Sequence, residues 1–294
     1  MTAADSIRRS RPDVNTSRCP GGSTQKRDRI DAFGSTIILA PSCSFRMALE
    51  EHWLFHTACV AYPGLAIVVQ SECQPTTSVR GSEAELTPML SSDAQRMLIE
   101  ENAGGSSRIS EAMSFECLHR TFGARLLALE MELKYWPSNG SITDYAIEVD
   151  DAVLGVSVTR AMTKPGERLV TEAAAGLLRK KLNGVVRSTQ ECISHDLQKQ
   201  ILHVWVRTAE EAEVIKQAYA NTIEPELASS TAVLVTVCGL SLLFDEKSRA
   251  PMARCGRLAK GAKDASHMRV LMESDPMRCN ANLSGVCCHV GHEQ

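Results

Sequence analysis

Hydrophobic residues follow a regular pattern only in the central part of the chain. Between residues 114 and 130 they recur at three- and four-residue steps, which predicts a helix with one buried stripe. Members of this stripe are Phe115, Leu118, Phe122, Leu126 and Leu129. Three extended segments are predicted to follow, over residues 132–136, 142–149 and 153–161. A turn sequence separates the first two segments, and the pair Asp150-Asp151 predicts a tight hairpin between the last two.

Helices and strands are predicted to alternate after the third extended segment. A helix begins at Thr171, a strand follows over 201–206, and a further helix covers 210–219. The last segment, 231–238, is almost entirely apolar, which is typical of a strand covered on both faces. Because a three-strand meander lies beside crossover units, the order predicts an α/β fold with a mixed central sheet flanked by helices.

The pattern also predicts how the chain is divided. No sustained hydrophobic period appears before the first predicted helix or after the last predicted strand. We therefore predict a poorly ordered N-terminal region over 1–109, an α/β domain over 110–246, and a poorly ordered C-terminal tail over 247–294.

Composition narrows the classes of partner and compartment. The 294 residues carry a formal net charge of −3, so any nucleic-acid surface must be a local patch. Eleven cysteines without the spacing of a small disulfide-rich domain, and no apolar segment directly after the N-terminal arginines, predict an intracellular protein of the cytoplasm or nucleus that is not secreted. The most apolar stretch, Trp53–Val69, contains His56 and Pro63, so no membrane partner is predicted.

Two stretches of the meander carry a resemblance to a known family. The sequence Pro-Ser-Asn-Gly-Ser-Ile-Thr-Asp at 137–144 opens the second predicted strand, and Leu-Gly-Val-Ser-Val-Thr-Arg at 154–160 forms the third. Together with the order α-β-β-β-α-β, they resemble the restriction-endonuclease-like core of the PD-(D/E)XK nuclease superfamily. In that family an acid on the first helix, an aspartate at the second strand and a Glu-x-Lys on the third strand surround a divalent metal. The resemblance covers fewer than half of the residues and implies Mg²⁺ as the cofactor.

The resemblance assigns roles to particular side chains. Asp144 matches the strand-two aspartate, and Glu116 or Glu130 takes the place of the outer acid, so these three are the candidate metal ligands. Some members of the family carry the cation on the helix after the third strand, which Lys180 or Lys181 resembles. Asp144 and these two lysines are therefore the candidate catalytic residues.

The third strand departs from the family pattern. Ser157 and Thr159 share one face of that strand by alternation and stand where Glu-x-Lys is expected. Neither residue supplies a carboxylate for Mg²⁺ or an ammonium for the attacking water, which predicts weak or absent metal binding. Asp144 also has a purely structural interpretation, because aspartate after a Gly-Ser turn often bonds nearby backbone amides.

The implied partner is nucleic acid, and three arginines are candidate substrate-binding residues. Arg160 ends the third predicted strand, and Arg179 and Arg187 lie on the outer side of the following helix, where a phosphate backbone or only solvent would meet them. We expect a nucleic-acid-binding protein with a degenerate, weak or inactive metal-dependent nuclease-like domain. An active Mg²⁺-dependent phosphodiesterase with a relocated lysine, or a protein-interaction scaffold that binds no nucleic acid, are the alternatives, so whether the protein is an enzyme stays open.

Two further groups of residues have simpler interpretations. Cysteines and histidines gather at the C-terminus in a way that suggests zinc, but without the paired Cys-x-x-Cys spacing of structural zinc sites. They are Cys279, Cys287, Cys288, His289 and His292. His203 alternates with apolar neighbours and is predicted to be an ordinary residue of the sheet.

Overall fold

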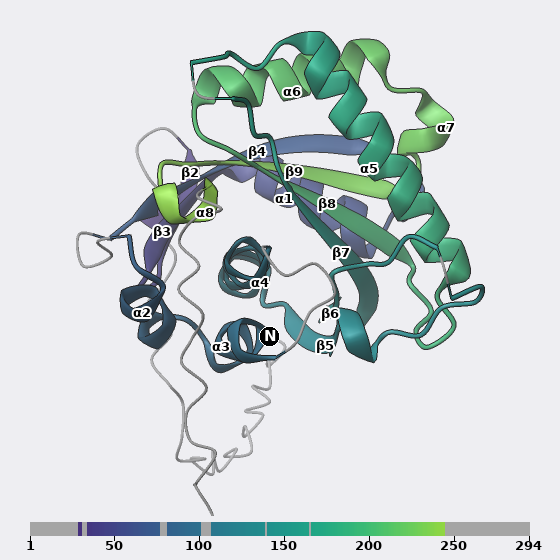
Figure 1. The fold of residues 1–294 in the computed structure, drawn as a ribbon, viewed down its shortest axis with the longest axis horizontal. Coiled ribbons are helices and arrows are strands. Elements are labelled where there is room, and N and C mark those ends of the chain that lie inside the picture. The colour runs from purple at the N-terminus through teal and green to yellow at the C-terminus, as the bar shows by residue number, and fades with distance from the viewer. Residues whose placement is uncertain are drawn as a thin grey trace, which may run out of the picture. The chain divides into compact units, whose positions relative to one another are not determined.

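A mixed β-sheet with helices on both faces forms the centre of the protein in a computed structural model (Figure 1). The structure describes residues 29–30, 34–76, 81–100, 107–138, 140–164 and 166–244, all of which lie in one compact unit, Met1–Arg249. In this described part the sheet has nine strands in the order β1-β2-β3-β4-β9-β8-β7-β6-β5. The predicted α/β class with a mixed sheet flanked by helices is therefore confirmed.

The bounds of the elements are as follows. The strands are β1 (Arg29–Ile30), β2 (Ser35–Leu39), β3 (Cys43–Ala48), β4 (Ile67–Pro75), β5 (Arg125–Leu129), β6 (Tyr145–Val149), β7 (Ala152–Arg160), β8 (Lys199–Val206) and β9 (Thr231–Cys238). The α-helices are α1 (Leu49–Val60), α2 (Glu83–Leu86), α3 (Ser92–Ile99), α4 (Arg108–Phe122), α5 (Thr171–Glu191), α6 (Ala209–Thr222), α7 (Pro225–Ala228) and α8 (Ser241–Phe244). Two short 3₁₀ helices are η1 (Thr87–Met89) and η2 (Glu130–Glu132).

Parallel strands occupy the middle of the sheet and antiparallel strands its two sides. β7, β8, β9 and β4 run parallel to one another, whereas β5, β6 and β7 form an antiparallel meander and β1 to β4 pair antiparallel. The hairpin between β6 and β7 turns at Asp150 and Asp151, whose φ angles are 44° and 67°. Aspartate tolerates this left-handed conformation, which matches the twist of a tight hairpin.

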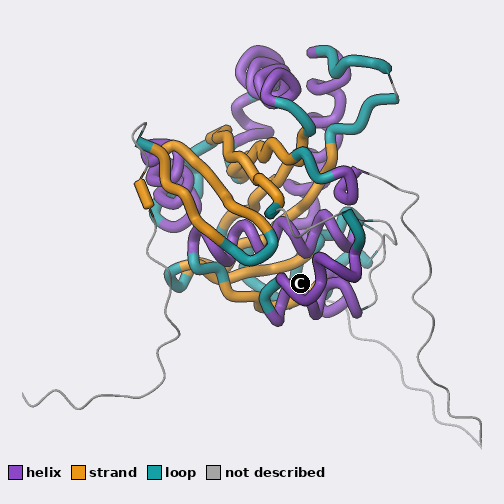
Figure 2. The backbone as a smooth tube through the Cα atoms, turned by 90° about the vertical axis from the view of Figure 1, so that its left-hand side faces the viewer, coloured by secondary structure: helices purple, strands orange, loops and turns teal. Residues whose placement is uncertain are grey.

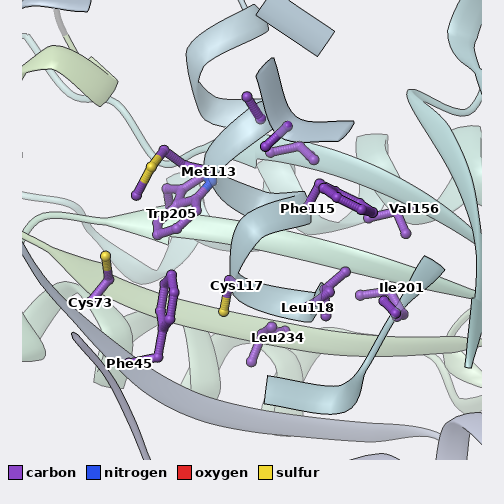
Figure 3. Close-up of a cluster of buried hydrophobic side chains, with 14 of the residues drawn as sticks. Phe45, Cys73, Met113, Phe115, Cys117, Leu118, Val156, Ile201, Trp205 and Leu234 are labelled. Carbon is purple, nitrogen blue, oxygen red and sulfur yellow. The ribbon is translucent and has the colours of Figure 1, made fainter. Parts of the chain in front are cut away.

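Two layers of helices bury the two faces of the sheet. α4 packs on one face, and its residues Met113, Phe115, Cys117 and Leu118 lie over the strand side chains of the larger core (Figure 3). α5 and α6 cover the opposite face, and the view turned by 90° also shows helices on both sides of the strands (Figure 2). The strands β8 and β9 are buried over nearly their whole length, which explains their continuous apolarity. Among the described helices, none combines the length and apolarity needed to cross a bilayer.

The N-terminal region differs from its prediction. Residues 34–76 and 81–100 contribute strands and helices to the same unit, and β4 pairs directly with β9, so the prediction of poor order is wrong for these residues. The alternation of apolar and polar residues in β4 is hard to recognise in the sequence because the inward-facing residue at position 71 is a serine. Inside the protein, Ser71 forms a 2.7 Å hydrogen bond with Thr236 on β9. Residues 1–28 and the predicted tail, with its cysteines and histidines, lie outside the described residues.

The first predicted helix and strand also have different limits. α4 begins at Arg108 and ends before Gly123, whose φ of 69° gives the left-handed cap that commonly terminates a helix. The residues predicted to continue this helix form β5 instead, and the predicted strand 132–136 is not part of the sheet. The remaining strands and helices of the prediction occur within a few residues of their expected limits, and β6 and β7 are antiparallel as predicted.

Candidate functional site

Asp144 lies directly before β6 and is attached to the backbone of β7. Its backbone N–H donates to the carbonyl of Val156 at 3.1 Å, and its Oδ2 accepts from the N–H of Val158 at 2.5 Å. The carboxylate therefore does bond a backbone amide, as the structural interpretation expects, but on the neighbouring strand rather than in its own turn. This bond fixes the half-buried side chain against the third strand of the meander.

Several charges act on this carboxyl group. Burial is the main cause that raises the pKa of Asp144 to about 8, and the charge of Glu111 adds to it. The N–H of Val158 and the charge of Lys181 oppose the rise, whereas Glu130 adds to it. Three carboxylates and one ammonium thus share one region, contributed by α4, η2, the start of β6 and α5.

Glu111, which the sequence analysis missed, is the acid of the first helix that acts on Asp144. Its side chain belongs to α4 and the residue is only 5% exposed. The helix begins at Arg108, before the predicted start at residue 114, so Glu111 fell outside the prediction. A signal was present, because Glu111 lies four residues before Phe115 and continues the buried stripe backwards.

Glu116, the other candidate on this helix, has different partners. Its Oε2 accepts from the backbone N–H of Ser91 at 2.8 Å, and its Oε1 pairs with Arg120 Nε at 2.9 Å. The buried carboxylate thus holds the start of α3 against α4. Glu130 begins η2 and is half-buried, and its charge contributes to the environment of Asp144.

The two candidate lysines are placed differently on α5. Lys180 is exposed, whereas Lys181 is half-buried and its charge lowers the pKa of Asp144. Adjacent residues of a helix point in directions about 100° apart, so only one of these two lysines faces the carboxylates. The structure brings Lys181 to the Asp144 region.

Ser157 and Thr159 lie on the side of the sheet that α5 covers. Their partners on β8 are Leu202 and Val204, which belong to the core beneath α5 and α6. Ser157 is 7% exposed and Thr159 is half-buried. The two residues share a face, as alternation predicts, and it is the face from which Lys181 approaches.

All three candidate arginines have partners within the protein. Arg160 donates to the carbonyl of Leu243 at 3.1 Å, and Arg187 pairs with Glu191 at 3.3 Å. Arg179 donates to the carbonyl of Thr222, at the end of α6, and pairs with Glu224. Arg179 and Arg187 are exposed, and exposed ion pairs contribute little free energy, so a phosphate could compete for both guanidinium groups.

The carboxylates near Asp144 do not make a complete site for a divalent ion. Within the described ranges, no group of three or more His, Cys, Asp or Glu side chains lies close enough to hold a metal ion. Asp144 and Glu111 interact electrostatically, and serine stands where a further carboxylate is expected. The residues fit Mg²⁺ only in part, because the ion needs six oxygens in octahedral geometry and two carboxylates leave most of these positions to water and substrate phosphates.

A separate chain of buried polar groups lies under α4. Ser71, Thr236, His203, Ser114 and Tyr145 are linked in that order by hydrogen bonds of 2.7, 2.7, 2.6 and 2.6 Å. All five residues are at most 3% exposed. Burial lowers the pKa of His203 to about 3, so the imidazole is neutral and accepts from one neighbour while it donates to the other.

Comparisons with known proteins identify a partial relative. The chain is 40% identical over 154 residues to the "AAC-rich mRNA clone AAC4 protein" of Dictyostelium discoideum, a match that covers 50% of this chain and 22% of that protein. No family model matches, and no solved structure matches. The chain therefore spans about a fifth of the length of the curated relative that it matches.

Proposed function

We propose that this chain is an intracellular nucleic-acid-binding protein whose nuclease-like site is degenerate, with weak or no metal-dependent cleavage. The observation that carries the proposal is the shared electrostatic environment of Asp144, Glu111 and Lys181. Carboxylates beside an ammonium are the groups that hold a divalent ion and meet a phosphate in metal-assisted hydrolysis. Strongly perturbed pKa values cluster at functional sites.

The order of the elements supports this interpretation. α4, β5, β6, β7, α5 and β8 follow one another as α-β-β-β-α-β. Asp144 stands at the second strand of this series, an acid comes from its first helix, and Lys181 comes from its second helix. These are the positions that the resemblance to the PD-(D/E)XK superfamily implies, although the acid is Glu111 rather than Glu116.

Weak metal binding follows from the donor set. Asp144 and Glu111 would hold Mg²⁺ with help from phosphate oxygens of the nucleic acid, and the bound ion would supply an activated water. Since the pKa of Asp144 is about 8, this carboxyl group carries a proton at neutral pH for much of the time. A protonated ligand binds Mg²⁺ poorly, which adds to the effect of the missing strand carboxylate.

An active phosphodiesterase is the second candidate, and the position of Lys181 favours it. Its ammonium acts on Asp144 from the helix after the third strand, where it can stabilise charge on a phosphate. The family carries a lysine on the third strand, where this chain has Thr159. In an active phosphodiesterase Lys181 takes the role of that lysine. The two candidates differ only in whether the bound ion activates water well enough for turnover.

Cleavage assays on the full chain separate these candidates. We expect slow or no cleavage of DNA and RNA with Mg²⁺ or Mn²⁺, while binding to at least one of them is retained. If cleavage occurs, Asp144→Ala abolishes it. The double variant Ser157→Glu/Thr159→Lys is expected to raise metal affinity, measured by isothermal titration, because both side chains face α5.

Circular dichroism of each variant checks that the fold is intact. Robust cleavage that survives Asp144→Ala would refute the site. Absence of any binding to DNA and RNA would favour the protein-interaction scaffold instead.

A further inference from the structure

Three cysteines that are far apart in the sequence meet at one end of the sheet. Cys43 begins β3, Cys73 lies near the end of β4, and Cys238 ends β9. Their exposures are 1%, 1% and 0%, and none of the three takes part in a disulfide. They lie on the face of the sheet that α4 covers, in the same core as Phe45 (Figure 3).

The strand register places one pair at a separation that a disulfide can span. Cys73 and Cys238 are direct partners across the parallel strands β4 and β9. Neighbouring strands lie about 4.8 Å apart, and a disulfide spans Cα atoms that are about 4.4–6.8 Å apart. On the antiparallel strands β3 and β4, Cys43 is opposite Pro75 and Phe45 is opposite Cys73. Cys43 therefore lies diagonally across from Cys73.

The surroundings give the two paired sulfurs different character. Contact with the Cys73 thiol is the main cause that lowers the pKa of Cys238, and the backbone N–H of Leu240 also lowers it. Contacts with Cys238 and Cys43, together with burial, raise the pKa of Cys73. By contrast, burial raises the pKa of Cys59 to about 12 and that of Cys117 as well. Cys238 is therefore better able to carry a negative charge than Cys73, Cys59 or Cys117.

The cluster lies just beneath the surface at this end of the sheet. Gly239, directly after Cys238, is exposed, and so is Pro41, two residues before Cys43. The ends of strands open locally more often than the middle of a sheet does. A small oxidant such as hydrogen peroxide can reach Cys238 through such opening.

We propose that Cys238 and Cys73 form a peroxide-sensitive thiol pair that closes to a disulfide between β4 and β9. The Cys238 thiolate attacks one oxygen of hydrogen peroxide, an S–O bond forms as the O–O bond breaks, and hydroxide leaves and becomes water with the proton that the thiol released. The Cys73 sulfur then attacks the Cys238 sulfenic acid, the S–O bond breaks, and the hydroxyl group leaves as water with the Cys73 proton. In total, two thiols and one peroxide give one disulfide and two waters.

The test treats the folded full-length chain with hydrogen peroxide, blocks the remaining thiols after denaturation, and maps the peptides by mass spectrometry. We expect a linked peptide pair containing Cys73 and Cys238, and loss of free Cys238 at least about ten times faster than loss of free Cys117. A linkage of Cys43 to Cys73, or equal rates at Cys238 and Cys117, would overturn the proposal.

Variants assign the order of the two steps. In Cys73→Ser the sulfenic acid on Cys238 should persist and be trapped by dimedone, whereas Cys117→Ser, the matched buried control, should still form the disulfide. Dimedone labelling of Cys43 in place of Cys238 would also contradict the assignment. The peptide map of the unaltered chain decides the pairing even if a variant does not fold.

Discussion

Asp144 and Tyr145 are neighbours in the sequence, yet Asp144 belongs to a group of charged side chains and Tyr145 to a chain of neutral ones. Tyr145 ends a buried chain of neutral groups in which hydroxyl and imidazole atoms bond one another from β4 to β6. The pKa of Asp144 is raised first by burial and then by two other carboxylates, and one lysine opposes the rise. Both regions contact α4, which contributes Ser114 to the neutral chain and Glu111 to the charged group.

This difference distinguishes a structural role for the buried neutral groups from a functional role for the carboxylates around Asp144. Polar groups that satisfy one another in the interior stabilise a single arrangement of the sheet and the helix, because each loses its water but gains a partner. Carboxylates gathered together repel one another and lower stability, so their retention is expected where they serve binding or catalysis. Removing a polar group should therefore lower the free energy of unfolding in the buried chain that ends at Tyr145 and raise it among the carboxylates around Asp144.

Removal of His203 should have the largest effect. His203→Ala leaves Ser114 and Thr236 without the imidazole and creates a cavity, so we expect a loss of about 2–4 kcal/mol in the free energy of unfolding. Urea denaturation followed by circular dichroism measures it. His195→Ala, in the loop after α5, is the control and should change the free energy by less than about 0.5 kcal/mol. Equal effects of the two substitutions would contradict a stabilising role for the buried chain.

The same histidine makes stability depend on pH. Its pKa is about 3 in the folded protein and 6.5 ordinarily, so between these values the unfolded chain binds the proton and the folded chain does not. Stability should therefore fall as the pH drops from about 6.5 towards 3. The part of this dependence that His203 causes should be missing in His203→Ala, as urea midpoints at several pH values would show.

Asp144→Asn should act in the opposite direction. Asparagine keeps an oxygen that accepts from Val158 N–H but carries no charge, so we expect a gain on the order of 1–3 kcal/mol at pH 8, discounted for the partial solvent contact of the side chain. In the folded protein the pKa of Asp144 is about 8, whereas the ordinary value is 3.8. Between these two pH values the folded chain binds the proton and the unfolded chain does not, so wild-type stability falls as the pH rises from 3.8 to about 8.

The gain from Asp144→Asn should accordingly vanish near pH 4. Asp151→Asn, in the exposed turn between β6 and β7, should show no comparable gain at any pH. If Asp144→Asn destabilised the protein equally at pH 4 and pH 8, Asp144 would be a structural cap and not a member of a repelling cluster.

A smaller effect is expected from Glu111→Gln. Removing this negative charge should lower the pKa of Asp144 towards its usual range, because Glu111 is the largest charge that raises it. A carbon-detected NMR titration of the aspartate carboxyl groups measures the change. Glu116→Gln, which alters the acid paired with Arg120, should leave the pKa of Asp144 nearly unchanged. The reverse order of effects would restore Glu116 as the acid of the site.

The sequence predicted helices and strands correctly where the spacing of hydrophobic residues matches the buried face of the element, as in α5, α6 and β9. It was misleading where an inward position is polar, because Ser71 and Ser114 are satisfied by partners on distant strands or helices that no local pattern reveals. Asp144 could be singled out as a candidate because its position after a turn and before a strand is local information. Glu111 was missed, although its spacing from Phe115 places it on the same buried stripe, since its approach to Asp144 depends on where α4 begins and on how that helix packs across the sheet.

Nucleic-acid binding by lysine variants tests the proposed site most directly. Fluorescence anisotropy of labelled DNA and RNA should show binding by the wild-type chain, and Lys181→Ala should weaken it about three- to tenfold, as expected for loss of one phosphate contact. Lys180→Ala, on the exposed side of α5, is the matched control and should weaken binding less. Equal effects of the two variants, or binding that neither variant changes, would contradict the placement of the nucleic acid at Asp144 and Lys181.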